Sequence, residues 1–458
     1  MDSTQSRLRV LMLPWLAHGH ISPFLELSKR LTERNFHIYF CSTPVNLSSI
    51  EPKLSDKYSL SIHLVELPLP SLPELPPHYH TTKGLPPHLN TTLKRAFDMA
   101  SSTFSSILKT LDPDLLIYDF LQPWAPEIAS SLNIPAVNFF CSGAATISFV
   151  FNAMKNPGVE FPFPEIQLHD YMKARFVDSP NEDHSNSSED DDHHVNDIDR
   201  ALKTFERSSR IVLMKTFEEL EGKYMDFLSR LIEKKIVPVG PLIQLPVPAD
   251  DHDGKSKIIE WLDERELCST VFVSFGSEYF LSKEEMEEIA YGLELSKANF
   301  IWVVRFPEGD KIKLEEALPE GFLGRVGEKG MVVEDWAPQV QILRHSSIGG
   351  FVSHCGWSSV MESIDFGVPI VAIPMQLDQP LNARVVEAAG VGVEVKRDRD
   401  HGKLEREEVA RVIKEAVMGK IGENARKKER DMRDNLRRKG EEEMDRVADQ
   451  LVHLFGTN

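Results

Sequence analysis

Stretches of continuous apolar residues alternate with helix-like patterns through the first half of the chain. Residues 9–13 (RVLML) form such a run, which is typical of a parallel strand buried on both faces. Ser22 and Pro23 follow it and suit the N-cap and the first position of a helix. The same pattern predicts further strands at 36–41, 114–119, 134–140 and 210–215. Strands that alternate with helices indicate βαβ units and an open parallel sheet.

Two stretches interrupt this alternation. Residues 178–199 are polar and acidic, which predicts a mobile loop. Residues 241–257 are rich in proline and then charged, and their place near mid-chain predicts an interdomain linker. The predicted domains are therefore 1–240 and 258–440, with a C-terminal helix at 441–458 expected to pack back on the first domain.

The strand and helix alternation restarts after residue 257. Ser282 and Glu285 predict a capping box at the start of a helix, and a second helix is expected at 405–418. Strands are predicted at 271–275, 300–304, 331–333, 349–354 and 368–374. The predicted fold class is α/β, with two facing Rossmann-like domains and the active site in the cleft between them.

Composition and charge exclude several classes of partner. The chain has 52 Lys and Arg against 71 Asp and Glu, a net charge of −19, whereas binding to nucleic acid or an anionic membrane needs a basic surface. No apolar run approaches the ~18 residues that span a bilayer, and no signal-peptide cleavage site follows the first strand, so we expect a cytoplasmic protein. The four cysteines form no CxxC pair, which argues against a disulfide framework. A monomer is expected, although the sequence does not specify the oligomeric state.

The most specific motif covers the 44 residues 336–379. At its centre a predicted strand ends at His354, a tight turn follows, and a helix begins near Ser359. A helix N-terminus offers free N–H groups and positive partial charge, which suit a diphosphate. Ser277 follows a neighbouring predicted strand and is expected to lie near the same helix N-terminus. The motif comprises Trp336-Ala337-Pro338-Gln339, His354-Cys355-Gly356-Trp357-Ser358-Ser359, Glu362 and Asp378-Gln379.

In length and internal spacing this motif resembles the signature box of the plant family 1 UDP-dependent glycosyltransferases. The resemblance covers the whole chain and implies the GT-B architecture and a UDP-sugar as co-substrate. A flat indole at Trp336 suits stacking against a base, and Gln339 and Glu362 suit the ribose hydroxyls. The resemblance adds Asp378 and Gln379 as ligands of the sugar, and Ala337, Trp357, Ser358 and Ser359 as further donor-site residues.

Individual members of the motif also have a purely structural interpretation. Ser359 and Glu362 have the spacing of a capping box, which needs no ligand. Trp336 and Trp357 taken singly are more often core residues than ligand-binding residues. Ser358 departs from the family, which usually has Asn there, and its shorter side chain puts that contact with the sugar in doubt.

A second pair of residues lies in the first half of the chain. His20 follows the first predicted strand, and Asp119 ends the strand predicted at 114–119. Both therefore belong to the carboxyl edge of the sheet, where open α/β folds bind ligands. A histidine backed by a carboxylate is a competent general base, and the resemblance implies this role for His20 and Asp119. The alternative is that His20 only caps or packs a helix start.

No metal or cofactor site is predicted from the sequence. The pairs His18/His20 and His193/His194 lack an accompanying ligand set for zinc. Two DxD-like triplets, at 190–192 and 398–400, lie in charged, loop-like stretches. Gly390-Val391-Gly392 lacks the third glycine of a dinucleotide fingerprint, which excludes a typical NAD site.

The expected reaction is an inverting, metal-independent transfer of a sugar from a UDP-sugar, with Gln379 favouring glucose. Residues 13–20, 75–89 and 275–290 resemble the branch of the family that extends sugars already attached to natural products, which includes crocetin glucosyl ester β-1,6-glucosyltransferases. The implied acceptor is a small-molecule glycoside, with Phe120, Trp124, Phe139 and Phe140 as possible lining residues. Two alternatives stay open: a transferase acting directly on an aglycone hydroxyl or carboxyl, and a protein that only binds or epimerises nucleotide sugars.

Overall fold

The protein is described here by a computed structural model of residues 7–55, 57–169, 197–244, 257–307, 312–334, 336–398 and 401–455. The chain forms two compact units. The first contains the described residues of Met1–Pro157, Asp183–Val247 and Arg438–Asn458, and the second those of Gly158–Glu182 and Pro248–Arg437. Each unit is built on one sheet of parallel strands, which confirms the predicted α/β class with two Rossmann-like domains.

The sheet of the first unit has seven strands in the order β3-β2-β1-β4-β5-β6-β7. All of its strand pairs are parallel. The order reverses between β1 and β4, and such a switch point is where open α/β sheets bind ligands. The strands are β1 Leu8–Leu13, β2 Phe36–Ser42, β3 Ile62–Glu66, β4 Leu115–Tyr118, β5 Ala136–Phe140, β6 Ile211–Met214 and β7 Lys235–Pro238.

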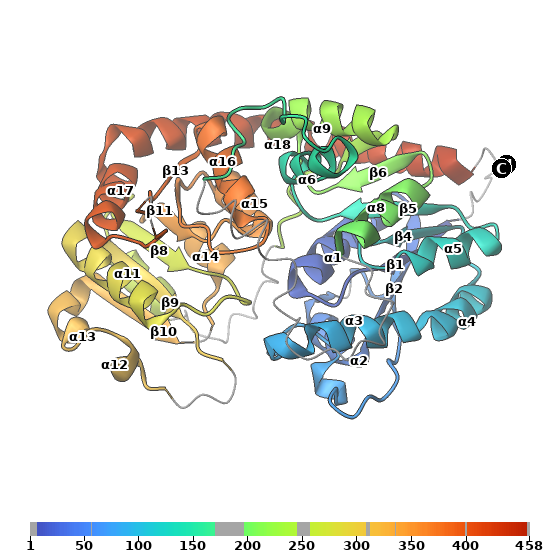
Figure 1. The fold of residues 1–458 in the computed structure, drawn as a ribbon, viewed down its shortest axis with the longest axis horizontal. Helices are drawn as coiled ribbons and strands as arrows, with labels where there is room; N and C mark the ends of the chain where they lie inside the picture. The colour runs from blue at the N-terminus through green and yellow to red at the C-terminus, as the bar shows by residue number, and fades with distance from the viewer. Residues whose placement is uncertain are drawn as a thin grey trace. The chain divides into compact units, whose positions relative to one another are not determined.

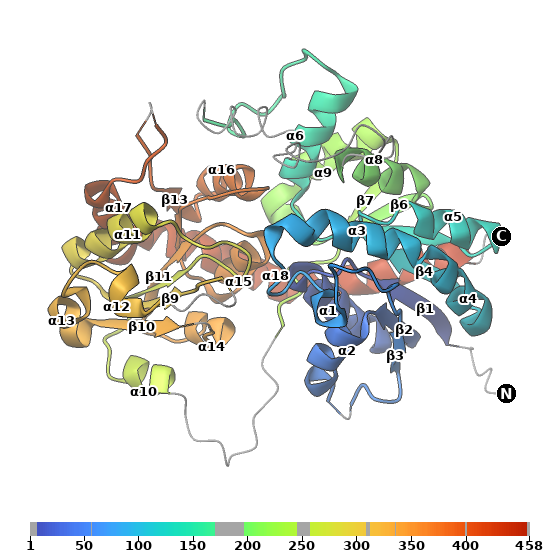
Figure 2. The same cartoon turned by 60° about the horizontal axis from the view of Figure 1, so that its bottom comes forward.

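Helices cover both faces of this sheet (Figures 1 and 2). One core contains Val10 and Met12 of β1 together with apolar residues of α1, α2 and the C-terminal helix α18 (Lys420–Phe455), and the other contains Leu11 and Leu13 with those of α3, α4 and α5. Continuous burial on both faces is why β1 has no polar alternation. The helices of this unit are α1 His18–Thr32, α2 Pro44–Ile50, α3 Asn90–Met99, α4 Ser101–Leu111, α5 Trp124–Ser131, α6 Ala144–Lys155, α8 Asp197–Arg207 and α9 Glu218–Ile232, with 3-10 turns η1 Glu51–Lys53, η2 Pro77–Tyr79 and η3 Pro87–Leu89.

The second unit repeats this plan with six parallel strands in the order β10-β9-β8-β11-β12-β13. Its switch point lies between β8 and β11. The strands are β8 Thr270–Ser274, β9 Asn299–Val304, β10 Gly330–Glu334, β11 Ile348–Ser353, β12 Ile370–Ala372 and β13 Gly392–Glu394. The helices are α10 Lys257–Asp263, α11 Lys283–Ser296, α12 Leu314–Ala317, α13 Phe322–Val326, α14 Gln339–Leu343, α15 Trp357–Phe366, α16 Gln379–Ala389, α17 Arg406–Met418 and α18 Lys420–Phe455, with the 3-10 turn η4 Gly327–Lys329.

The α11 and α17 helices pack side by side on one face of the second sheet (Figures 1 and 2). The predicted capping box at the start of α11 is confirmed, because Ser282 Oγ accepts from Glu285 N and the Glu285 carboxylate accepts from Ser282 N. The inward positions of α17 are buried in the same core, as its helical spacing predicts.

Three edge strands, β3, β7 and β13, were not predicted. Each is only partly buried and includes charged or other polar residues (IHLVE, KIVP and GVE), so it lacks the continuous apolar run that identified the central strands. The predicted start of the first helix was wrong as well. α1 begins at His18 with Ala17 as N-cap, and Pro23 lies inside the helix, which therefore includes His20 in its first turn.

The two stretches predicted as loop and linker fall mostly outside the described residues. Of residues 178–199, only 197–199 are described, and they form the first turn of α8. Of residues 241–257, the structure describes 241–244 and Lys257, which begins α10. Among the helices of the described chain, none combines the length and apolar character needed to cross a bilayer.

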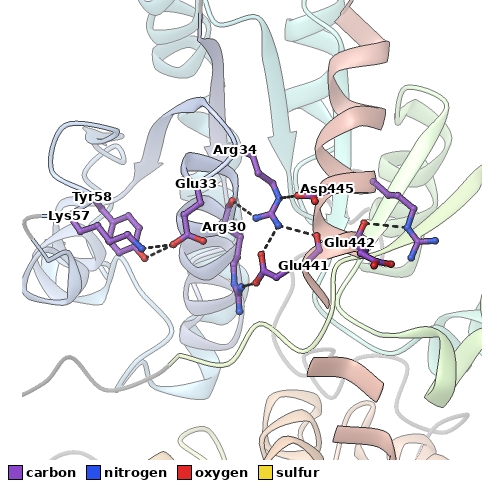
Figure 3. A network of polar contacts seen from close by, with 9 residues as sticks. Arg30, Glu33, Arg34, Lys57, Tyr58, Glu441, Glu442 and Asp445 are labelled. Atoms are coloured by element: carbon purple, nitrogen blue, oxygen red, sulfur yellow. Dashed lines mark hydrogen bonds and ion pairs between the residues drawn. The ribbon is translucent and has the colours of Figure 1, made fainter. Parts of the chain in front are cut away.

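The last part of α18 belongs to the first unit and is tied to α1 by ion pairs (Figure 3). Arg34 donates to Asp445 at 2.8 Å and to the Glu441 carboxylate at 2.7 Å, and Arg30 donates to Glu441 at 2.6 Å. The hydrogen bond from Arg34 lowers the pKa of Glu441. These contacts fix the C-terminal end of the helix that carries His20 in its first turn.

Candidate active site

His20 and Asp119 are brought together at the switch point of the first sheet. The strands β1 and β4 are parallel neighbours, with Leu13 opposite Tyr118, so the residues that follow them meet at the carboxyl edge. His20 Nδ1 lies 2.8 Å from Asp119 Oδ2. The imidazole side chain is 19% exposed, whereas that of Asp119 is fully buried. The imidazole therefore reaches solvent while its carboxylate partner does not.

Backbone N–H groups orient the Asp119 carboxylate. Its Oδ2 also accepts from Trp15 N at 2.9 Å, and its Oδ1 accepts from Phe120 N at 2.8 Å. A carboxylate held in this way accepts the Nδ1–H of His20, which leaves Nε2 with a lone pair. This arrangement can take a proton from a substrate hydroxyl and stabilise the imidazolium that forms.

Of the four aromatic residues expected to line an acceptor pocket, Phe120 alone is in ring contact with His20. The two rings stack at 5.3 Å with an interplanar angle of 25°. Phe139 is fully buried against Phe24 in the core and presents no surface to a ligand in this structure. Phe140 is 4% exposed and packs on Phe120, and Trp124 donates through Nε1 to Asp98 while packing among core aromatic rings. Alternation along a strand sends Phe139 and Phe140 to opposite faces, which the apolar run alone did not reveal.

His354 lies at the corresponding switch point of the second sheet, after β11. The neighbouring strand β8 leads to Gly276, whose φ of +77° is left-handed. A Cβ on Gly276 would lie 2.6 Å from His354 Nε2, so only glycine permits this close approach. Burial lowers the pKa of His354 to about 4, which makes the imidazole neutral at neutral pH. Its Nδ1 has no hydrogen-bond partner among the described residues.

Helix α15, which follows the turn after His354, starts earlier than a capping box of Ser359 and Glu362 requires. α15 begins at Trp357 with Gly356 as N-cap and no side-chain cap, so Ser359 and Glu362 do not form a capping box. Instead, Gln339 Nε2 donates to Glu362 Oε2 at 2.7 Å and to Ser359 Oγ at 3.1 Å. The structure therefore joins three predicted donor-site residues from α14 and α15 into one polar cluster.

The other predicted donor-site residues differ in exposure. Trp336 is 69% exposed and can offer a ring face to a base, whereas Trp357 is 4% exposed and packs as a core residue. Ser277 is exposed beyond the end of β8, and Ser358 is half-buried in the first turn of α15. Ala337 is buried next to Trp336 and presents no polar side chain to a ligand.

Asp378 and Gln379 stand at the start of α16, with Asp378 as its N-cap residue. Gln379 is 5% exposed, and its Oε1 accepts from the backbone N–H groups of Met375 and Gln376, both at 3.0 Å. The amide oxygen is thus committed to the loop before the helix, and the amide nitrogen is the group that suits donation to a sugar hydroxyl.

Sequence reasoning missed Asn382, one turn further along α16. Its side chain is fully buried, and Nδ2 donates to the carbonyl oxygen of Cys355 at 3.0 Å. Cys355 has a left-handed φ of +64°, and its own N–H donates to Ser353 Oγ at 3.1 Å. Asn382 therefore holds the turn after His354 to the helix that starts with Gln379. No sequence motif marks such a side chain, because its partner is a backbone atom 27 residues away.

Replacing Asn382 by alanine is expected to raise KM roughly tenfold for the UDP-sugar that the 336–379 motif implies, with a smaller effect on KM for the acceptor. The reason is that an unpaired buried carbonyl costs about 1–3 kcal/mol and leaves the turn at Cys355 free to shift. Steady-state kinetics with each substrate varied in turn measures the two constants. Ser296→Ala is the matched control: Ser296 is equally buried in the same unit and bonds Leu293 O at 2.7 Å, away from the motif. Equal KM values for the two variants would show that Asn382 serves stability alone.

The chain matches two protein families along most of its length. Residues 260–431 match the family described as UDP-glucoronosyl and UDP-glucosyl transferase, and residues 6–244 match the glycosyltransferase N-terminal domain family. Among curated proteins, it is 56% identical to the Siraitia grosvenorii mogroside IIIx synthase, over 99% of this chain and 95% of that protein. It is 52% identical to the Gardenia jasminoides β-D-glucosyl crocetin β-1,6-glucosyltransferase, over 97% and 98% respectively. The predicted resemblance to the glycoside-extending branch is thereby confirmed.

Solved structures share the whole fold. A Glycyrrhiza uralensis UGT complexed with glycyrrhetinic acid 3-O-monoglucuronide superposes with a TM-score of 0.83 over 98% of this chain and 96% of that chain, at 23% identity. The Phytolacca americana UGT2 complexed with UDP-2fluoro-glucose and pterostilbene does so with a TM-score of 0.76 over 98% and 100%, at 26% identity. The two-sheet architecture of this chain is thus that of the plant enzymes.

Proposed function

Because the chain belongs to the UDP-glucosyl and UDP-glucuronosyl transferase family, and is a UDP-glycosyltransferase of GT-B fold, we propose that it transfers glucose from UDP-glucose to a sugar hydroxyl of a small-molecule glycoside. The observation that supports the acceptor class is the identity of 52% over nearly full length to an enzyme named β-D-glucosyl crocetin β-1,6-glucosyltransferase. The product is a glycoside with a disaccharide.

His20 acts as the general base of this reaction. With Nδ1–H donated to Asp119, its Nε2 accepts the proton of the acceptor hydroxyl. The hydroxyl oxygen forms a bond to the anomeric carbon of the donor sugar as the bond from that carbon to the UDP oxygen breaks. The electron pair of the breaking bond leaves with UDP. Attack from the side opposite UDP inverts the anomeric configuration, through a transition state of oxocarbenium character.

The donor motif stabilises the leaving diphosphate. The N-terminus of α15 supplies free N–H groups, and His354 and Ser277 lie at the carboxyl ends of the neighbouring strands β11 and β8. Fixed dipoles of this kind favour charge that develops on the leaving oxygen, so the reaction needs no metal ion or other cofactor. The rate in the presence of EDTA should accordingly equal that without it.

The remaining residues of the 336–379 motif bind either the nucleotide or the sugar of the UDP-sugar. Trp336 stacks on the base, and Gln339 and Glu362 bind the ribose hydroxyls after their mutual hydrogen bond opens. Asp378 and the Gln379 amide nitrogen bind the sugar hydroxyls. Ser358 is too short to replace the asparagine usual at its position, so its contact with the sugar is lost or bridged by water.

A second candidate acceptor is an aglycone. The Phytolacca americana relative was solved with pterostilbene, which carries no sugar, and the ring of Phe120 beside His20 offers apolar surface for such a ligand. The two acceptor classes differ in what must lie against His20: a polar sugar in one case and the aromatic or terpenoid body in the other.

Isotope-labelled UDP-glucose offered with an aglycone and with its monoglucoside distinguishes these functions. We expect label to be transferred to the monoglucoside with a kcat/KM at least tenfold above that for the aglycone, a preference of about 1.4 kcal/mol. Mass spectrometry of the product then shows a disaccharide. The reverse preference would assign the aglycone as acceptor, and binding of UDP-glucose without transfer to either would leave a nucleotide-sugar binding protein.

A further inference from the structure

The catalytic pair has a third neighbour that the proposed reaction does not use. Cys141 follows β5, the strand next to β4, and its side chain is 5% exposed. One ligand atom from each of His20, Asp119 and Cys141 lies within 4.8 Å of the other two. Burial, together with the charge of Asp119, raises the pKa of the Cys141 thiol, and Lys215 opposes the shift. Thus an imidazole, a carboxylate and a thiol converge on one point at the carboxyl edge of the sheet.

These three donors match a soft divalent cation. Imidazole nitrogen, carboxylate oxygen and thiolate sulfur are the ligands that zinc takes in proteins, whereas Mg²⁺ and Ca²⁺ prefer oxygen ligands throughout. Tetrahedral bonds of about 2.0–2.3 Å place ligand atoms roughly 3.3–3.6 Å apart. The distances between the three ligand atoms, which are at most 4.8 Å, therefore have to change by about 1 Å or slightly more when the ion binds. The 2.8 Å between His20 Nδ1 and Asp119 Oδ2 has to widen, and the thiol has to approach. The partly exposed His20 leaves a fourth position open towards solvent.

No sequence motif indicates this site, because His18 and His20 have no ligand set near them in the chain. The fold supplies the other two ligands from 99 and 121 positions further on, at the ends of β4 and β5. His18 is not part of the cluster.

We propose that His20, Asp119 and Cys141 form an inhibitory site for a thiophilic divalent cation, with Zn²⁺ as the cation that fits it. Zinc binds the Cys141 sulfur, whose proton is released to solvent, and takes the place of the proton between His20 Nδ1 and Asp119. That proton moves to Nε2, so the neutral imidazole keeps one proton. Because Nε2 then carries a proton, it has no lone pair for the acceptor hydroxyl, and transfer stops.

Each bound zinc ion therefore releases one proton and traps the imidazole in the inactive tautomer. The inhibition rests on the proposed role of His20 as base, but the binding of metal to the three side chains does not. UDP binding should be unaffected, since none of the three residues belongs to the donor motif.

Cobalt titration of the full-length protein tests the site without any sugar transfer. Co²⁺ bound to a thiolate gives a sulfur-to-metal charge-transfer absorption in the near ultraviolet, and Zn²⁺ should displace it. We expect Cys141→Ala and the more conservative Cys141→Ser both to lose this band. Cys268→Ser, which alters the partly exposed cysteine of the second unit, should keep it. Survival of the band in both Cys141 variants would overturn the proposed site.

Zinc titration of the transferase activity tests the consequence. With each variant normalised to its own activity without metal, the zinc concentration for half-inhibition should rise at least tenfold in Cys141→Ala. The reason is that loss of a contact around a metal site typically lowers metal affinity by about 10–100-fold. Mg²⁺ at the same concentrations should not inhibit. Equal zinc sensitivity of the wild type and the Cys141 variants would refute the inhibitory role. A protein that shows the cobalt band but transfers no sugar would instead contradict the proposed function and leave the metal site intact.

Discussion

Replacing His20 by alanine should lower kcat about 10²–10⁴-fold while leaving the affinity for UDP essentially unchanged. The variant loses the Nε2 lone pair proposed to accept the proton of the acceptor hydroxyl, and it removes nothing from the 336–379 motif of the second unit. Initial rates at saturating UDP-glucose and acceptor measure kcat, and calorimetric titration with UDP measures the affinity.

His18→Ala is the matched control, because His18 occupies the first position of the same helix but is exposed and does not pair with Asp119. It should retain near wild-type turnover. Asp119→Asn is a useful companion, since it keeps the shape of the side chain but removes the charge that fixes the Nδ1–H tautomer and stabilises the imidazolium. A His20→Ala enzyme within tenfold of the wild type would refute the assignment of the base.

The central strands could be predicted from the sequence because burial on both faces leaves continuous apolar runs, as in β1 and β8. The edge strands β3, β7 and β13 could not, because each is partly exposed and its apolar residues stand next to charged or other polar ones. The start of α1 was misplaced for a different reason. Pro23 favours a first helical position, but the backbone N–H groups of His20 and Ile21 already bond to Ala17 O, so the helix begins a turn and a half earlier.

The residue types of the candidate site could be predicted from the 336–379 motif and the two strand ends, but the contacts that hold them could not. Trp15 and Phe120 orient Asp119 through backbone N–H groups, which every residue type except proline supplies. Asn382 bonds a backbone carbonyl, and Cys141 lies beside His20 and Asp119 because their strands are neighbours. Such contacts depend on which strands become neighbours, information that lies in the sheet order and not in local spacing.

Substitution of Gly276 by alanine should lower kcat/KM for UDP-glucose about 10²-fold, the loss that a misplacement of roughly 1 Å causes at a reacting group. The added Cβ would lie 2.6 Å from His354 Nε2, well inside contact distance, so the imidazole has to move away from β8. His354 is itself enclosed beside the backbone of Gly356, where a Cβ would be equally close, and it cannot shift without disturbing the turn that starts α15. Steady-state kinetics with UDP-glucose and calorimetry with UDP measure the effect on the donor site.

Gly390→Ala separates this clash from backbone strain. Gly390 lies in the same unit with a φ of +70°, close to the +77° of Gly276, but a Cβ there meets nothing within 4 Å. Both variants should lose about 1–2 kcal/mol of stability because alanine disfavours a left-handed backbone. The loss of kcat/KM should be confined to Gly276→Ala. If Gly390→Ala loses as much activity as Gly276→Ala, general strain in the second unit explains the effect, and the position of His354 is not what determines how UDP-glucose binds.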